Sequence, residues 1–306
     1  MACFHPVKAN LISYLGGRCV QLNPLGWEEG RTDCAPFDWT VRKDGRDQVV
    51  RAFKSECIWL PCGKCEGCLI ERSRQWASRC IKESQNYKEN CFLTLTYDND
   101  HLPANNSLIK RDLQLFIKRL RKQISPARVR YFGCGEYGSL GLRPHYHLIL
   151  FGYHFTDLIF RIENNRSFTE SKMLKSLWKY GFVSVGKVTF ESCAYVARYV
   201  MKKLHPKILG DRTPEFICMS TRPGIANLLF NQNGEEISEN GFMFSAGRKV
   251  ATPRYCDKVV AKKNPLKLAE IKEERKSKIK PYNPVELGRK IAFTHYLQSL
   301  KTDRKL

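Results

Sequence analysis

The stretch from Arg143 to Phe151, RPHYHLILF, decides how the middle of this 306-residue chain folds. Its alternating pattern and apolar end predict a strand, and in a strand every second side chain lies on the same face. His145 and His147 are therefore expected to point one way and Tyr146 the other. Two imidazoles side by side on a strand suit a divalent metal ion, although a histidine pair alone is a weak signal.

A second strand is predicted just before the histidines. Residues 129–136 (VRYFGCGE) have a strand pattern, and the turn-rich residues 138–144 (GSLGLRP) would fold the two segments into a hairpin. In that hairpin Glu136 lies beside His145. Two neutral imidazoles and one carboxylate leave coordination positions open for a substrate oxygen. Glu136, His145 and His147 are therefore the candidate ligands of Mg²⁺ or Mn²⁺.

The segment 191–203, ESCAYVARYVMKK, predicts a helix with chemistry on one face. Tyr195, Tyr199 and Lys202 fall on that face at positions i, i+4 and i+7, with Lys203 at its margin. Tyrosine can act as a covalent nucleophile, and its attack on a phosphodiester leaves a phosphotyrosyl-DNA intermediate that conserves the bond energy for rejoining. The two tyrosines are the candidate nucleophiles, and either lysine would offset charge on the phenolate or the phosphate.

Three motifs now stand in order: FLTLT at residues 92–96, the histidine pair, and the tyrosine pair. This order resembles the HUH-type rolling-circle replication endonucleases. The paired tyrosines and the flanking PCGKC at residues 61–65 are similar to the replication initiators of the microviruses, the gokushovirus-like single-stranded DNA phages. The aromatic Tyr146 departs from the aliphatic residue usual between the histidines, which a strand tolerates by pointing it into the opposite layer.

The resemblance implies a metal-dependent endonuclease and strand-transferase that nicks single-stranded DNA at a replication origin. It would begin and end rolling-circle replication of a phage genome in the cytoplasm of the host bacterium. Its partners would be the origin DNA and the host helicase and polymerase machinery, because the sequence contains no phosphate-binding loop of the kind helicases use. The DNA contacts are assigned to four residues of the motif regions: Thr94, Thr96, Arg143 and Arg198.

The charge balance supports a nucleic-acid partner. Lysine and arginine number 52 against 30 acidic residues, a net charge of +22. A polyanion is the expected partner of so basic a chain, with nucleic acid ahead of a membrane surface. Aromatic and basic residues alternate in places such as 128–132 (RVRYF), which favours single strands. No apolar run approaches a membrane span, and the first residues lack the pattern of a signal peptide.

The thirteen cysteines concentrate around Cys62-x-x-Cys65-x-x-Cys68. Their odd number and the absence of an export signal favour thiols or a metal site over disulfides. Structural zinc is the preferred interpretation. The fourth ligand would come from Cys3, which we take first, or from His5, Cys57 or Cys80. An iron–sulfur cluster is the competing site, although the next cysteine expected three residues on is missing, and ordinary free cysteines remain open.

The core pattern predicts an α+β fold with a central antiparallel sheet and flanking helices, as in a split βαβ arrangement. Residues 91–97 form a central strand, 109–124 an amphipathic helix, 171–180 a second helix and 182–188 another strand that leads to the tyrosine helix. The expected domains are a Cys-rich region at 1–90, an endonuclease core at 91–205 and a C-terminal region with a basic tail at 206–306.

The C-terminal region is less informative. Residues 231–234 (NQNG) indicate a loop and 242–245 (FMFS) a short strand, while the basic, partly helical tail from Lys258 is either a DNA-binding arm or a solvated segment. Two other functions remain open. A histidine-triad nucleotide hydrolase needs a third alternating histidine, but position 149 is Ile. A non-catalytic DNA-binding protein with structural zinc would not need the tyrosines.

Overall fold

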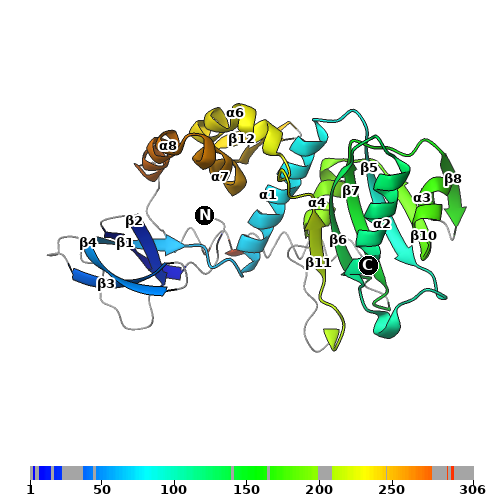
Figure 1. Cartoon of the computed structure of the whole chain (residues 1–306), viewed down its shortest axis with the longest axis horizontal. Coiled ribbons are helices and arrows are strands. Elements are labelled where there is room, and N and C mark those ends of the chain that lie inside the picture. Colours follow the sequence, from blue (N-terminus) through cyan, green and yellow to red (C-terminus); the bar gives the residue numbers. More distant parts are fainter. Residues whose placement is uncertain are drawn as a thin grey trace. The chain divides into compact units, whose positions relative to one another are not determined.

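The chain forms two compact units in the computed structural model, and each is described by itself (Figure 1). One unit comprises Met1–Leu69 with Tyr282–Leu306, and the other comprises Ile70–Pro281. The structure describes these residues: 3, 7–14, 17–22, 37–43, 46–138, 141–163, 166–198, 209–245, 247–277, 288, 291 and 292.

The first unit contains a four-stranded antiparallel sheet in the order β2-β1-β4-β3. Its strands are β1 (Val7–Tyr14), β2 (Gly17–Leu22), β3 (Phe37–Lys43) and β4 (Arg46–Leu60). The long strand β4 pairs with both β1 and β3. Sequence patterns indicated only a Cys-rich segment here, so this sheet is a finding of the structure.

The second unit is built on a five-stranded sheet in the order β10-β5-β7-β6-β11, and every neighbouring pair is antiparallel. The strands are β5 (Asn90–Tyr97), β6 (Arg130–Tyr137), β7 (Pro144–Phe151), β10 (Gly181–Gly186) and β11 (Phe216–Met219). The predicted α+β class with an antiparallel sheet is confirmed. The histidine strand β7 takes the centre, and β5, expected there, lies beside it.

Side-chain alternation divides the sheet into two apolar faces. On one face, residues such as Leu95 and Leu148 pack with α2 (Lys110–Gln123) and α3 (Lys172–Leu177). On the other, residues such as Phe132 and Ile149 pack with α1 (Glu66–Ser84) and α4 (Phe190–Arg198). Residues 145 and 147 share the parity of Ile149, so the histidines emerge on the α1/α4 face (Figure 1).

The helix expected over 171–180 is shorter than its pattern suggested. It begins after Ser171, whose hydroxyl accepts a hydrogen bond from Leu174 N, and it ends at Leu177. Trp178 leaves the helix to enter the core, where its indole donates to Thr96 O. Just before α3 the chain inserts a hairpin that the sequence did not indicate, formed by β8 (Leu158–Glu163) and β9 (Arg166–Ser171).

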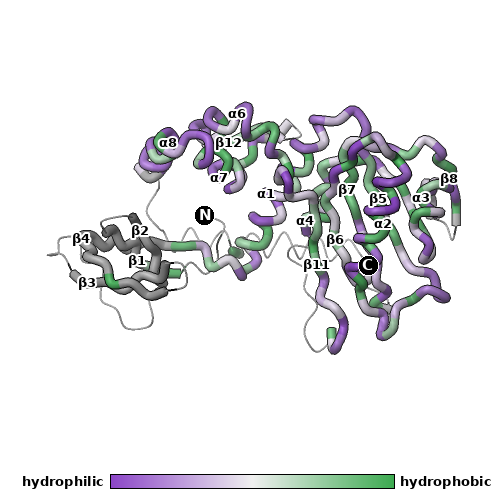
Figure 2. Tube along the Cα trace, viewed as in Figure 1, coloured by the Kyte–Doolittle hydropathy of each residue, from purple (hydrophilic) through white to green (hydrophobic). Residues whose placement is uncertain are grey.

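The last part of the second unit is mainly helical. It comprises α6 (Asn227–Asn240), β12 (Phe242–Ser245), β13 (Arg248–Ala251), α7 (Arg254–Lys263) and α8 (Pro265–Ser277). The expected strand at 242–245 and the partly helical tail are confirmed. The tube over α8 is mostly hydrophilic, in keeping with its charged sequence (Figure 2). Among the described residues, no helix has both the length and the apolar character that a membrane crossing requires.

The loop expected at 231–234 is wrong, because these residues lie inside α6. Gly234 faces α7, and a Cβ built at this position would lie 3.0 Å from Val260 Cγ2. The glycine therefore allows two helices to approach closely. Its conformational cost within a helix, about 1 kcal/mol relative to alanine, is offset by this packing.

Candidate metal and nucleophile site

The hairpin register brings the three candidate metal ligands together. Glu136 of β6 lies directly opposite His145 of β7, as the sequence predicted, and His147 lies two residues further along. The Nε2 atoms of His145 and His147 are 2.5 and 2.8 Å from the same oxygen, Glu136 Oε1. Glu136 is 2% exposed and His147 6%, so the group is withdrawn from bulk water.

The outer nitrogens of both imidazoles are held by other groups. His145 Nδ1 lies 3.0 Å from Arg143 O, and because a carbonyl oxygen only accepts, Nδ1 carries the proton. His147 Nδ1 lies 3.0 Å from the Thr94 hydroxyl. An imidazole that donates through Nδ1 has its Nε2 lone pair free for a metal, and such outer partners are typical of metal-binding histidines.

The carboxylate of Glu136 has one oxygen left over. Within the described parts of the chain, its buried Oε2 has no hydrogen-bond partner. Burial alone would raise the pKa of this carboxyl, but hydrogen bonds from His145 and His147 outweigh it and lower the pKa to about 2. Burial lowers the pKa of His147, with the Glu136 carboxylate opposing the shift. A charged carboxylate with an unpartnered buried oxygen beside two imidazoles is a donor set that fits a divalent cation.

The α4 helix delivers one candidate nucleophile to this group. Its buried residues Cys193, Val196 and Ala197 pack on the sheet, and this packing turns Tyr195 toward the ligands. The Tyr195 hydroxyl donates to Glu136 Oε1 at 3.1 Å and lies 3.5 Å from His147 Nε2. The other residues of the predicted tyrosine face, Tyr199, Lys202 and Lys203, lie outside the described residues.

The four candidate DNA contacts lie around the group in different settings. Arg143 donates to Tyr97 O and to Asn99 Oδ1, so its guanidinium also braces the turn after β5. Arg198 is exposed at the end of α4, with its guanidinium carbon 5.6 Å from the centre of the Tyr195 ring. Thr94 and Thr96 are half-buried and lie opposite His147 and His145 in the β5/β7 register.

Two contributors to the site were missed in the sequence. Phe92 stacks on the His147 ring with a centroid distance of 5.6 Å and an interplanar angle of 14°. Thr94 was assigned to DNA, but its hydroxyl contacts His147. Strand alternation places residues 92 and 94 on the same face, so the pairing of β5 with β7 was the signal that would have identified both.

Tyr146 confirms the expected opposite orientation. It is fully buried in the α2 layer, where its hydroxyl contacts the Tyr97 hydroxyl at 2.8 Å, donates to Ile109 O and accepts from Ile109 N. The residue between the histidines therefore fastens β7 to the start of α2. It leaves the ligand face undisturbed.

The candidate zinc residues come together in the first unit, where the sulfurs of Cys3, Cys62, Cys65 and Cys68 all lie within 4.8 Å of one another. Of the alternative fourth ligands, Cys80 is buried in the apolar core beside α4. His5 and the side chain of Cys57 lie outside the described residues.

Comparison with known proteins identifies the family. Residues 90–204 match the family model of the replication-associated proteins of the ORF2 type. The replication-associated protein ORF2 of Spiroplasma virus 4 is 32% identical over 293 residues, which cover 90% of this chain and 86% of that protein. The chain belongs to the replication-associated proteins of single-stranded DNA phages. The resemblance drawn from the motifs is thereby confirmed at the level of the family.

Two further replication-associated proteins show similar relationships. VP4 of Bdellovibrio phage phiMH2K is 32% identical over 232 residues, covering 72% of this chain and 73% of that protein. ORF4 of Chlamydia phage 1 is 37% identical over 182 residues, covering 54% of this chain and 42% of that protein. No solved structure matches the chain. The segment matched by the family model begins at β5 and extends beyond α4, so it contains the whole of the metal and nucleophile site.

Proposed function

We propose that this replication-associated protein is a metal-dependent HUH-type endonuclease and strand-transferase that nicks single-stranded DNA at a phage replication origin. The observation that carries the proposal is the position of the Tyr195 hydroxyl, 3.1 Å from the carboxylate that both candidate histidine ligands face. A nucleophile beside a cation site is the arrangement that phosphodiester transfer requires. The family's role in replication gives this chemistry its substrate class.

Glu136, His145 and His147 would hold Mg²⁺ or Mn²⁺. When bound, the ion would supply positive charge against the scissile phosphate and the charge that develops in the transition state. Arg143 O and the Thr94 hydroxyl keep the two Nε2 lone pairs aimed at the same point. Phe92 closes one side of His147 by stacking. The chain's own residues thus orient the ligands before DNA arrives.

In the proposed step, the Tyr195 oxygen forms a bond to phosphorus and one phosphorus–oxygen bond of the DNA backbone breaks. The phenol proton faces Glu136 Oε1 at the outset, and the leaving oxygen gains a proton to become a hydroxyl. Polymerases extend 3′-hydroxyl ends, so a nick that starts replication must release the 3′ oxygen. The tyrosine then keeps the 5′ phosphate as an ester, which conserves the energy needed for rejoining.

The second tyrosine explains how a round of rolling-circle replication ends. While one tyrosine remains esterified to the 5′ end, Tyr199 would cut the regenerated origin, and the freed 3′-hydroxyl would attack the first phosphotyrosine to close a unit circle. Lys202 or Lys203 would offset charge on the phenolate or phosphate. Arg198, at the exposed end of α4, and the half-buried Thr96 would contact the DNA strand.

The net charge of +22 supports binding of the DNA backbone, and the protein would act in the cytoplasm of the infected bacterium. Strand separation and synthesis would fall to the host helicase and polymerase. A non-catalytic DNA-binding role predicts the same charge. It gives no reason for a tyrosine hydroxyl to lie against a buried Glu–His–His group.

The metal requirement is tested on single-stranded oligonucleotides that tile the genome encoding this chain. Excess chelator should abolish nicking, and added Mn²⁺ or Mg²⁺ should restore it. Glu136→Gln keeps the side-chain volume but removes the charge, so several kcal/mol of electrostatic stabilisation are lost and nicking should fall roughly 100-fold or more. The matched control is Glu89→Gln, which changes an exposed carboxylate at the edge of β5.

Glu89→Gln should nick at the wild-type rate. Full activity of the wild type in excess chelator would refute the metal assignment. Equal losses in both glutamine variants would show that the effect is one of general charge rather than of the site.

A further inference from the structure

The four cysteines near the start of α1 meet because of how the first sheet is paired. Strands β1 and β4 are antiparallel, with Val7 opposite Leu60 at one end of the pair. Cys3 lies just before that end of β1, and Cys62 lies just after that end of β4. The chain then turns through residues 63–65 into α1, whose first turn contains Cys68. Residues distant in sequence are thereby brought to one point.

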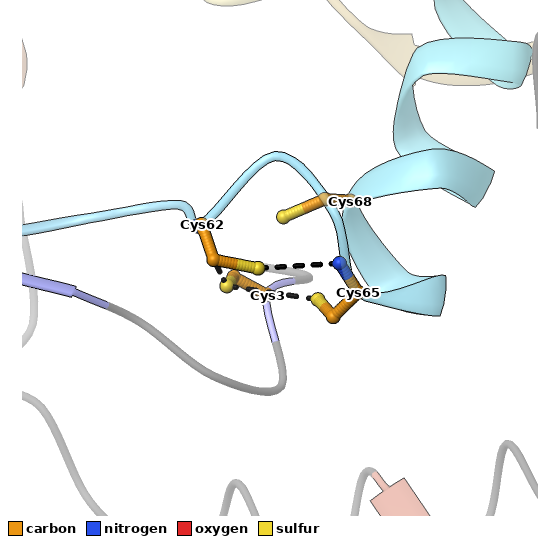
Figure 3. A group of neighbouring side chains, drawn as sticks. All are labelled: Cys3, Cys62, Cys65 and Cys68. Carbon is orange, nitrogen blue, oxygen red and sulfur yellow. Dashed lines mark hydrogen bonds between the residues drawn. The ribbon is translucent and has the colours of Figure 1, made fainter.

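Local hydrogen bonds hold the thiols with their sulfurs toward one another (Figure 3). The Cys62 amide donates to Cys3 Sγ at 3.2 Å, and the Cys65 amide donates to Cys62 Sγ at 3.2 Å. Gly63, with a φ of +74°, makes the tight turn between them. Backbone N–H groups aimed at sulfur stabilise the negative charge of a thiolate, the form that binds a metal.

The spacing of the sulfurs is that of a single ion. A tetrahedral ion with zinc–sulfur bonds of about 2.3 Å has sulfur–sulfur edges of about 3.8 Å. The Cys65 and Cys3 sulfurs are 3.7 Å apart, and all four ligand atoms lie within 4.8 Å of one another. A four-iron cluster binds its thiolates on four separate irons and needs a wider spread. At 3.7 Å this pair is also too far apart for a disulfide, which requires about 2.05 Å.

We propose that Cys3, Cys62, Cys65 and Cys68 bind one structural Zn²⁺ that fastens the end of the β1/β4 pair to the first turn of α1. The sheet it closes lies within Val7–Leu60, a size at which a small core usually needs a metal or disulfide to be stable. The binding free energy of the ion is then folding free energy of this unit. The site is independent of the nicking chemistry, which uses different residues in the other unit.

The test begins with the full chain purified under reducing conditions without chelator or added metal. Elemental analysis should find about one zinc per chain, and X-ray absorption at the zinc edge should give four sulfur ligands at about 2.3 Å. Replacement by Co²⁺ should give the intense visible bands of a tetrahedral cobalt thiolate. These measurements need no variant, so they decide the matter even where a substitution prevents folding.

Variants then assign the ligands. Cys68→Ser should lose zinc and melt at a lower temperature, whereas Cys68→His should retain zinc because imidazole is also a zinc ligand. Cys218→Ser is the matched control, since Cys218 is a half-buried thiol on β11, far from the cluster in sequence, and serine can keep its hydrogen bond to Gly133 O. Cys218→Ser should keep its full zinc content.

Zinc-free native protein without cobalt bands would overturn the proposal, as would zinc bound through nitrogen and oxygen or retained unchanged by Cys68→Ser. Iron and sulfide in stoichiometric amounts would assign a cluster instead. A chain that lacks zinc yet still nicks DNA would refute this site alone, whereas a zinc-loaded chain that never nicks would refute the proposed function alone.

Discussion

Replacing Thr94 by valine should weaken metal binding without touching a ligand. The Thr94 hydroxyl lies 3.0 Å from His147 Nδ1, and valine has nearly the same shape but offers no acceptor. With a metal on Nε2, the proton must sit on Nδ1, where it would be buried and unpaired. Without metal, the proton can move to Nε2 and donate to Glu136 Oε1, 2.8 Å away. The penalty therefore falls mainly on the metal-bound state.

The size of the effect follows from burial. His147 is 6% exposed, so water cannot fully replace the lost acceptor. A buried unsatisfied donor costs about 1–3 kcal/mol, which raises the dissociation constant roughly 5- to 150-fold. Losses of about 10- to 100-fold on removing the outer partner of a metal-binding histidine fall in the same range.

Titration of Mn²⁺, followed by the electron paramagnetic resonance signal of the free ion, measures this constant directly. Thr96→Val is the matched control, because it makes the same change two residues along β5, opposite His145. It should leave the affinity for Mn²⁺ within about twofold, the change expected when no hydrogen bond to a ligand is lost. An unchanged constant in Thr94→Val, or an equal loss in Thr96→Val, would refute the assignment of Thr94 as the residue that positions His147.

Two further predictions concern other parts of the chain. Tyr146→Phe removes the hydroxyl that bonds both backbone groups of Ile109, so the free energy of unfolding should fall by about 1–3 kcal/mol in urea titrations while the affinity for Mn²⁺ is kept. Lys258 and Lys262 line a hollow beside α7; if both contact phosphates, their double replacement by glutamine should reduce the salt dependence of single-strand binding by about 1.4 in log–log slope, whereas Lys272→Gln on α8 should not. An unchanged slope would assign these lysines to solvent, and an unchanged unfolding free energy would refute the role of Tyr146.

Much of the core was predictable because its patterns are local. The alternation around His145 and His147 fixed their common face, and the short turn before them fixed the position of Glu136. The sheet at residues 7–60 was not foreseen, since its strands are recognised through pairing between distant segments. The role of Thr94 also depended on pairing, that of β5 with β7.

The helix through Gly234 shows a different limit. Asparagine and glycine in sequence favour a turn, and the pattern gave no reason to expect otherwise. Contact with α7 overrides that preference, because only a residue without a side chain fits beside Val260. The Cys cluster was predictable as a set of ligands. The choice of Cys3 among the alternative fourth ligands was a guess that the β1/β4 pairing now explains.

The central claim is that a tyrosine of this site becomes covalently joined to DNA. The direct measurement incubates the chain with Mn²⁺ and the tiling oligonucleotides, isolates any adduct under denaturing conditions, and maps the modified peptide by mass spectrometry. The account predicts a 5′-phosphotyrosyl adduct on Tyr195 or Tyr199. Either single phenylalanine variant should still form an adduct, and the double variant should form none while it still binds the strand. An adduct in the double variant, or one mapped to any other residue, would contradict the account.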